Sequence, residues 1–217
     1  MGRYRKGLKT KNKIIQASKS LFYFNGYRKT TVQGIADLAD VNLGLISYYF
    51  KSKDNIAKSI FIGFLKEIEQ EVKNTYPDND KDIIQLYMAK ERIFFEIILT
   101  QENYQRFFRE IINSNMIFNL LEDYVEKNYN LINEKVKRIN NKNLITAFAA
   151  LETGGRYNIL RKYFRNTIDL ELDGLIDILI GCTPRLFGYS NEDVSRFIEE
   201  SKTYAEDVNK KNLKLLI

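Results

Sequence analysis

Apolar residues recur every three or four positions along most of the chain, while glycine and proline are sparse. In the segment 10–25 this stripe begins at Ile14 and continues to Phe24, and Gly26 then provides a stop signal. A repeat of three to four residues is that of a helix buried along one face, whereas strands alternate. The pattern therefore predicts an all-α protein.

Two short helices joined by a tight turn are predicted next. The first can be capped by Thr30 or Thr31. The segment 40–42 then breaks the repeat, and Asn42 can cap a second helix that extends to about Phe50. In a helix-turn-helix of this kind, the second helix enters the major groove of DNA with its N-terminal residues at the base edges.

Longer helices make up the rest of the chain. A helix is predicted over 54–76 and ends before Pro77. The apolar stripe predicts further helices over 82–100, 103–113, 116–139, 142–165, 169–182 and 191–210. The segment 142–165 is rich in Ala and Gly, small residues that allow another helix to approach closely.

The net charge is concentrated at one end of the chain. The whole chain carries +6, but residues 1–56 contain 11 basic and three acidic residues, which gives +8, and the remainder carries −2. A basic segment on a near-neutral body indicates a polyanionic partner, either nucleic acid or an anionic membrane surface. For the first basic residues, Arg3, Arg5, Lys6 and Lys9, a solvated arm is an equal alternative.

Composition excludes several kinds of chemistry. The chain has no histidine and a single cysteine, Cys182, so a histidine-based catalytic triad, a Cys/His zinc site and an intramolecular disulfide are impossible. We expect no metal, no cofactor and no enzymatic activity. An all-helical enzyme with a carboxylate site and a basic membrane-surface protein are the alternatives left open. No apolar stretch is long enough to span a membrane and no secretory leader is evident, so we expect a cytoplasmic protein.

Residues 14–56 resemble the tetracycline-repressor (TetR) family of transcriptional regulators, with the family's spacing kept throughout. The matching residues are Ile15, Ala17, Leu21, Phe22, Gly26, Tyr27, Thr30, Thr31, Val32, Ile35, Ala36, Ala39, Val41, Gly44, Ile46, Tyr49, Phe50, Ser52, Lys53 and Asp54. Asp40 departs from the pattern, since it stands where the family usually has a turn glycine. Aspartate tolerates the left-handed backbone conformation at some cost. Leu43 and Ser47 also differ from the usual residues, so an operator sequence cannot be transferred from a relative.

The resemblance implies a homodimer with two domains in each chain. An N-terminal three-helix DNA-binding domain would cover residues 1–53, and a larger helical domain, 54–217, would bind an effector and dimerise. Helix 54–76 would connect them, and helices 146–165 and 169–207 would form the dimer interface. The implied partners are double-stranded operator DNA, expected to be palindromic, and an unidentified small molecule. The protein would then be a repressor that its effector releases from the operator.

The DNA contacts are expected on and beside the second short helix. Ile46 and Phe50 lie four residues apart and face inward, which leaves their neighbours for the groove. Thr31 and Asn42 have an equally good interpretation as helix caps alone. The predicted contacts are Thr31, Asn42, Leu43, Gly44, Leu45, Ser47, Tyr48, Tyr49 and Lys53.

The effector site is predicted in the aromatic-rich region 82–165, although aromatic residues at helical spacing are more often core. Glu152 and Arg156 lie four residues apart, so a surface ion pair explains them equally well. The predicted pocket residues are Tyr87, Glu91, Phe94, Phe95, Phe107, Phe118, Tyr124, Phe148, Glu152 and Arg156. Cys182 is interpreted as a small buried apolar residue.

Overall fold

The computed structural model describes residues 2–77, 82–112 and 114–217, with side chains from Arg5 onward, and this part of the chain is helical without strands. The all-α prediction is therefore confirmed. The helices are α1 (Gly2–Asn25), α2 (Val32–Ala39), α3 (Leu43–Phe50), α4 (Lys53–Thr75), α5 (Ile83–Thr100), α6 (Glu102–Ile111), α7 (Asn115–Val136), α8 (Lys142–Phe164), α9 (Leu172–Ile180), α10 (Cys182–Leu186) and α11 (Asn191–Asp207), followed by the 3-10 turn η1 (Lys210–Asn212). We call α1–α3 the head and α4–η1 the body.

Two predicted boundaries are wrong. The first helix begins at Gly2 rather than near residue 10, so the basic N-terminal segment is helical and not an irregular arm. Lys and Arg favour a helix, and the Thr10 hydroxyl donates to the carbonyl of Lys6 one turn earlier. The predicted helix 169–182 is too long, because α9 spans only Leu172–Ile180 and the short helix α10 follows it before α11. The break follows Gly181, where a Cβ atom would lie 2.8 Å from the carbonyl oxygen of Asp177.

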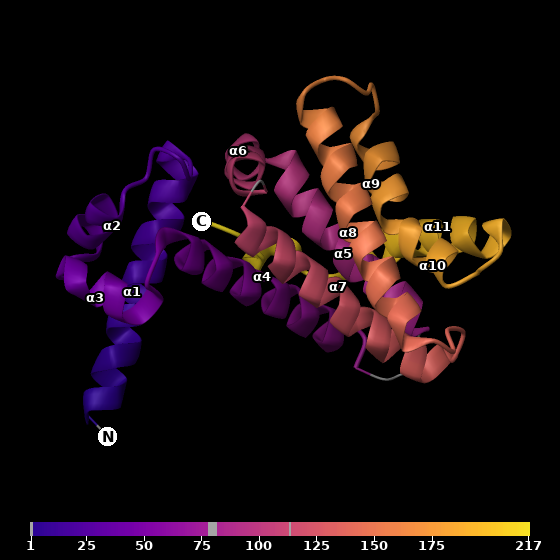
Figure 1. Cartoon of the computed structure of the whole chain (residues 1–217), viewed down its shortest axis with the longest axis horizontal. Coiled ribbons are helices and arrows are strands. Elements are labelled where there is room, and N and C mark those ends of the chain that lie inside the picture. Colours follow the sequence, from indigo (N-terminus) through magenta and orange to yellow (C-terminus); the bar gives the residue numbers. More distant parts are fainter. Residues whose placement is uncertain (1, 78–81, 113) are drawn as a thin grey trace.

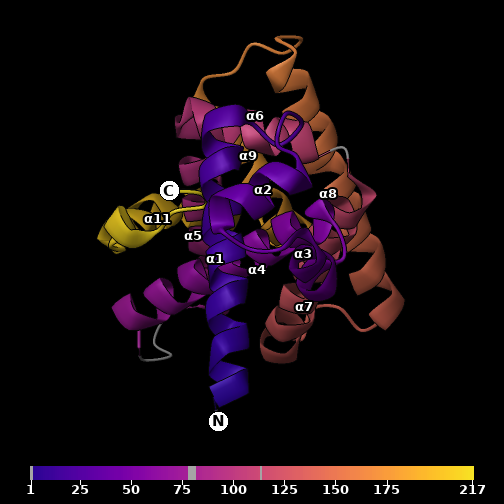
Figure 2. The same ribbon diagram turned by 90° about the vertical axis from the view of Figure 1, so that its left-hand side faces the viewer.

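Local capping sets the geometry of the head (Figures 1 and 2). The Thr31 hydroxyl accepts the amide of Gly34 at 3.0 Å and begins α2, and the Asn42 side chain accepts the amide of Gly44 at 2.8 Å and begins α3. Between the two helices, Asp40 adopts the left-handed conformation with φ of 52°. The turn between α2 and α3 therefore keeps its shape without a glycine.

The body is built around α5, which is buried along most of its length between α4, α7, α9 and α11. In Figure 1, α4 leaves the head and runs along the lower side of the body. Its apolar stripe, including Ile60, Phe64 and Ile68, is buried. Helix α4 begins directly after the head and packs along the body, so it runs from one part to the other.

Helix α6 holds the turn that follows α1. The Glu110 carboxylate accepts the backbone amide of Arg28 at 2.8 Å, and Arg106 donates to the carbonyl of Phe24 at 3.1 Å. Gly26 lies between these contacts with φ of +80°, and a Cβ atom there would lie 3.0 Å from the Glu110 carboxylate. The turn between α1 and α2 is thus fixed from outside the head.

The segment after η1 passes between the head and the body, where Figure 1 marks the end of the chain. Leu213, Leu215 and Leu216 are buried there. Lys19 of α1 donates to the carbonyl of Lys214 at 3.3 Å, and Tyr104 of α6 donates to the carbonyl of Ile217 at 2.7 Å. This segment therefore contacts both parts.

A buried arginine joins three helices of the body. Arg92 on α5 is fully buried and donates to Ser201 on α11 and to Asp173 on α9, each at 2.9 Å, and also pairs with Asp177. Ser201 is buried as well. Charged hydrogen bonds of this kind contribute more to stability than neutral ones.

We predict that Arg92→Met lowers the free energy of unfolding by about 2–3 kcal/mol, because it removes charged hydrogen bonds that fix α9 and α11 on α5. Chemical denaturation measures the change. Arg196→Met is the matched control, since Arg196 is exposed and pairs with Asp193 on its own helix, and it should change stability by less than about 1 kcal/mol. Equal stability of the two variants would contradict the assignment.

Candidate nucleic-acid interface and ligand pocket

One face of α3 is exposed and the other is buried in the head. Ile46 and Phe50 are 1% and 4% exposed, as the spacing predicts. The exposed side carries apolar and hydroxyl groups, namely Leu43, Gly44, Leu45, Ser47 and Tyr48. Leucine methyl groups can touch a thymine methyl, and hydroxyls can bond to bases or phosphates. This is the composition expected of a helix that enters a major groove.

Both predicted caps are confirmed as caps. Thr31 and Asn42 are exposed, and each uses its side-chain oxygen at a helix N-terminus. The backbone amides at those two N-termini attract anions. A phosphate contact by either residue stays a prediction that is compatible with capping.

Tyr48 and Tyr49 differ in their surroundings. Tyr48 is largely exposed, whereas Tyr49 is half-buried, with its ring edge-on to that of Tyr48 at 5.0 Å between centroids. The Tyr49 hydroxyl lies next to α1, 3.2 Å from where a Cβ atom of Gly7 would stand. Tyr49 therefore packs α3 against α1 and leaves only part of its ring toward solvent.

The structure gives Lys53 an internal role. Its ammonium group donates to the carbonyls of Tyr27 at 2.8 Å and Thr30 at 2.7 Å, and it lies 4.3 Å from the centre of the Tyr27 ring. Burial lowers the pKa of Lys53, which neighbouring Asp54 partly opposes. Lys53 thus fixes the turn before α2, and a phosphate contact would have to use the one remaining N–H group.

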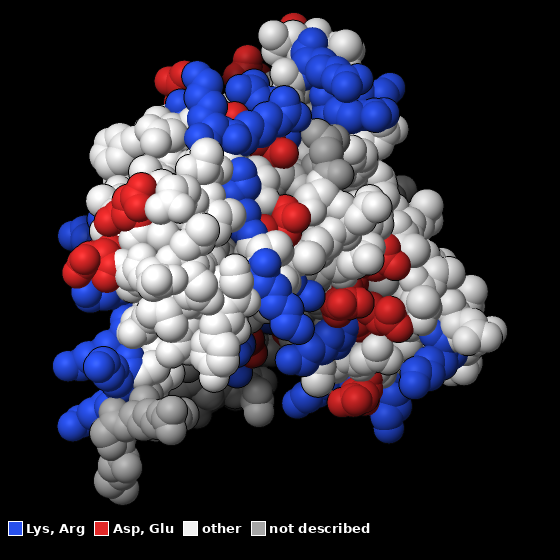
Figure 3. Space-filling view, turned by 60° about the vertical axis from the view of Figure 1, so that its left-hand side comes forward, with Lys and Arg blue, Asp and Glu red and all other residues white. Residues whose placement is uncertain are grey.

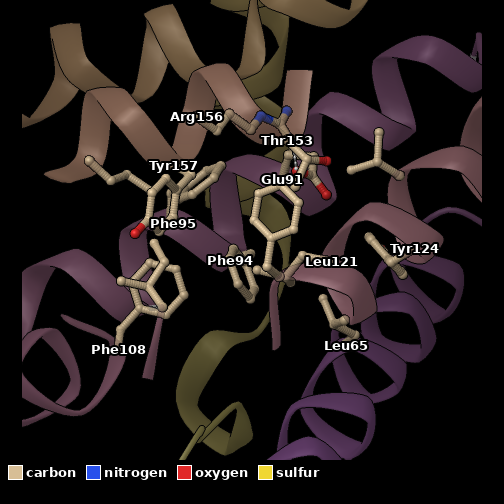
Figure 4. Close-up of a pocket in the computed structure, with 14 residues that line it drawn as sticks. Leu65, Glu91, Phe94, Phe95, Phe108, Leu121, Tyr124, Thr153, Arg156 and Tyr157 are labelled. Carbon is tan, nitrogen blue, oxygen red and sulfur yellow. Dashed lines mark hydrogen bonds and ion pairs between the residues drawn. The ribbon is translucent and has the colours of Figure 1, made fainter. Parts of the chain in front are cut away.

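A pocket opens in the body between α4, α5, α6, α7 and α8 (Figure 4). Six of the ten predicted residues line it, namely Glu91, Phe94, Phe95, Phe118, Tyr124 and Arg156. The pocket is also lined by residues that were not predicted from the sequence, namely Leu65, Phe108, Ile112, Leu121, Val125, Thr153, Tyr157 and Leu160. Most of these are ordinary apolar residues, so only their arrangement in space marks them.

Four predicted residues lie outside the pocket. Phe107 turns toward the head and stacks on Phe22. Tyr87 is fully buried with its ring against Tyr129. Phe148, on an earlier turn of α8, is half-buried, and Glu152 lies behind the pocket wall, where it bonds to other side chains.

The polar end of the pocket is a buried charge cluster. Arg156 pairs with Glu91 at 2.5 Å and with Glu152 at 2.7 Å, and all three are less than 10% exposed. The surface ion-pair interpretation of Glu152 and Arg156 is therefore wrong. Burial raises the pKa of Glu152. Burial would lower the pKa of Arg156, but the two carboxylates outweigh it and hold that pKa above its usual value.

One polar group at this end lacks a partner within the described residues. The Thr153 hydroxyl is buried and makes no hydrogen bond there. Figure 4 shows Thr153, Glu91 and Arg156 together at one end, with Phe94, Phe95 and Phe108 along the rest of the wall. An unsatisfied buried hydroxyl costs free energy. The pocket thus suits a mainly apolar molecule with one polar group.

The pocket is narrow in this conformation. About 530 Å³ is free of protein atoms, including space open to solvent, but only about 40 Å³ admits the centre of a water-sized sphere. Ligand pockets commonly measure about 300–1,000 Å³. A drug-sized molecule would therefore have to displace side chains or helices in the wall.

The N-terminal part of the chain matches a known family of proteins. A family model described as "Bacterial regulatory proteins, tetR family" matches residues 14–60. Residues 14–60, which comprise most of the head and the start of α4, are therefore similar to the N-terminal part of TetR-type regulators. The curated relatives that match the chain are named HTH-type transcriptional regulators.

Individual TetR-type relatives match at moderate identity. The probable HTH-type transcriptional regulator YttP of Bacillus subtilis is 31% identical over 128 residues, which are 54% of this chain and 58% of YttP. The chain thus matches less than two thirds of YttP. The HTH-type transcriptional regulator QacR of Staphylococcus aureus is 29% identical over 150 residues, or 68% of this chain and 71% of QacR.

Solved structures share the fold at low sequence identity. The crystal structure of RolR in complex with resorcinol has a TM-score of 0.65 at 11% identity, covering 89% of this chain and 95% of RolR. SmeT, the repressor of a Stenotrophomonas maltophilia multidrug efflux pump, has a TM-score of 0.54 at 16% identity, covering 82% of this chain and 91% of SmeT.

In the described ranges, no helix combines the length and apolar character needed to cross a membrane.

Proposed function

We propose that this chain is a TetR-type regulator, a cytoplasmic, homodimeric repressor that leaves a palindromic operator when a small molecule enters the pocket. The observation that carries the proposal is that one helix, α6, forms part of the pocket wall and also packs against the head. Phe108 lines the pocket, and its neighbour Phe107 stacks on Phe22 in the head. A movement of α6 would therefore change both the pocket and the contact with the head.

The DNA-binding part rests on the exposed face of α3 and on the charge of the head. Residues 1–56 carry +8, and neutralised phosphates account for most nonspecific affinity. Leu43, Gly44, Leu45 and Ser47 would meet base edges, while Thr31, Asn42, Tyr48, Tyr49 and Lys53 would meet phosphates. In a dimer, two α3 helices must enter successive major grooves about 34 Å apart.

The proposal that the protein is a dimer rests on an exposed apolar face of the body. Leu144 and Leu151 on α8 are 43% and 62% exposed, and Ile178 on α9 is 44% exposed. Gly155 lies one turn after Leu151 and is also exposed, which allows close approach of a second helix. Apolar groups gathered on one face favour association with a second copy through α8 and α9.

The effector would act through α4 and α6, because both contribute to the pocket and to the support of the head. Leu65 brings α4 to the pocket wall, and α4 begins at Lys53, beside the turn before α2. Widening the narrow pocket would shift these helices and change the separation of the two α3 helices. A coupling free energy of about 1–3 kcal/mol would change operator affinity roughly 5- to 150-fold.

For the DNA-binding part, we predict that Leu45→Ala and Ser47→Ala change the preference among operator sequences, because each removes one base-edge contact. The loss at the contacted base pair should be about 1–3 kcal/mol. Binding to a randomised DNA pool, followed by sequencing, measures it. Leu38→Ala is the control, since Leu38 is also an exposed leucine but lies on α2. A uniform loss over all sequences would contradict base reading.

For the dimer part, we predict that Leu151→Glu produces a monomer, because it places a charge in the apolar interface. Analytical ultracentrifugation measures the mass, and operator affinity should fall with it. Leu131→Glu is the matched control, since Leu131 on α7 is 45% exposed and outside the α8–α9 face. A dimeric Leu151→Glu protein would place the interface elsewhere.

For the effector part, we predict that Leu121→Trp binds the operator normally but no longer responds to effector, because the larger side chain fills the pocket. Leu131→Trp, on the same helix but exposed, should respond like the unmodified protein. Compounds from a thermal-shift screen of small aromatic molecules provide the effector, and fluorescence anisotropy of labelled operator measures release. Release that survives Leu121→Trp would show that the effector binds elsewhere.

A further inference from the structure

A second crevice lies where α6, the end of α8 and the turn after α1 meet. About 320 Å³ of it admits the centre of a water-sized sphere, far more than in the aromatic pocket. Four arginines line it, namely Arg28 of the turn, Arg109 of α6, and Arg161 and Arg165 at the end of α8. Figure 3 shows Lys and Arg side chains gathered at this upper end of the molecule.

The charge of these arginines is not neutralised within the described residues. Glu110 also lines the crevice, but its carboxylate accepts the backbone amide of Arg28 and holds the turn. Of the four guanidinium groups, Arg161 donates to the neutral side chain of Asn158 at 3.2 Å. No carboxylate in the described part of the chain forms an ion pair with any of the four.

The partial negative charges at nearby helix C-termini are too small to neutralise the four arginines. The C-terminal ends of α1, α6 and α8 all lie near the crevice, and each helix end carries a partial charge of about −0.5. Three such ends together offset about half of the net charge of +3 that the four arginines and Glu110 provide. An excess of positive charge therefore faces the crevice and favours a bound anion.

Arginine is the side chain best suited to bind phosphate or carboxylate groups, because its planar guanidinium donates two parallel hydrogen bonds. Phe164, half-buried in the crevice wall, adds an apolar surface for an organic group. We propose that this crevice binds a small multivalent anion, a phosphate ester or a polycarboxylate, between the head and the body. Arg28 holds it from the head, while Arg109, Arg161 and Arg165 hold it from the body.

An anion at this place would influence the orientation of the head. It would add a charged bridge beside the contacts of Glu110 with the turn. Since coupling between two binding sites is reciprocal, the anion and the operator would change each other's affinity by the same factor. Anion binding does not depend on the proposed repressor function. Only the effect of the anion on operator affinity rests on it.

The test is isothermal titration of the full chain, without DNA and at fixed ionic strength, with inorganic pyrophosphate in one arm and citrate in the other. We expect at least one of them to bind and the double variant Arg161→Gln with Arg165→Gln to weaken that binding about tenfold or more. Arg196→Gln with Lys135→Gln is the matched control, because it removes the same charge at exposed positions outside the crevice. Binding of one anion alone identifies the phosphate or the carboxylate chemistry.

Three outcomes would overturn the proposal. The first is that neither anion binds, and the second is equal weakening in the control variant, which would mean general attraction to a basic surface. The third is a loss of DNA affinity in the double variant without any anion, with a salt dependence lower by about two units, which would make the crevice part of the DNA-binding surface. Failure of the repressor function would leave anion binding without DNA unchanged, so the two failures are distinguishable.

Discussion

The packing of one aromatic ring determines how the head lies on the body. Phe107 of α6 stacks on Phe22 of the head at 5.1 Å between ring centroids and on Phe61 of α4 at 5.8 Å. All three rings are fully buried. Because close-packed interiors transmit small displacements rather than absorb them, α1, α4 and α6 must move together. The position of α3 relative to the body follows from this contact.

The two glutamates around Arg156 illustrate a second constraint. Buried charges are tolerated when they are paired and hydrogen-bonded, and removal of one member of the cluster would leave another without a partner. Arg156 also donates to the carbonyl of Leu179 at 3.0 Å, so the cluster joins α5, α8 and α9. The same cluster therefore forms the polar end of the pocket and fixes the helices behind it. A ligand that enters there meets a rigid polar end and a more adaptable aromatic wall.

Features that depend on neighbouring residues in the chain could be predicted, whereas features of tertiary packing could not. The caps at Thr31 and Asn42, the turn at Asp40 and the inward face of α3 follow from local chemistry, and the structure has all of them. The pocket was predicted in part, because its aromatic residues stand out by type. Leu65 and Phe108 were not predicted, because an apolar stripe in the sequence does not show which of its residues line a pocket. For Glu152 and Arg156 the sequence left a pocket and a surface ion pair equally open, because spacing alone does not reveal burial.

The contacts of α6 with the turn after α1 have a consequence for how such proteins recombine. Arg106 holds the end of α1 and Glu110 holds the turn 26–30, although both side chains come some 80 residues later in the chain. A head transplanted from a relative would meet these two side chains with a turn of different sequence. A chimera that keeps these contacts would therefore have to take the head and α6 from the same protein, so the suitable crossover point lies after α6 rather than between α3 and α4.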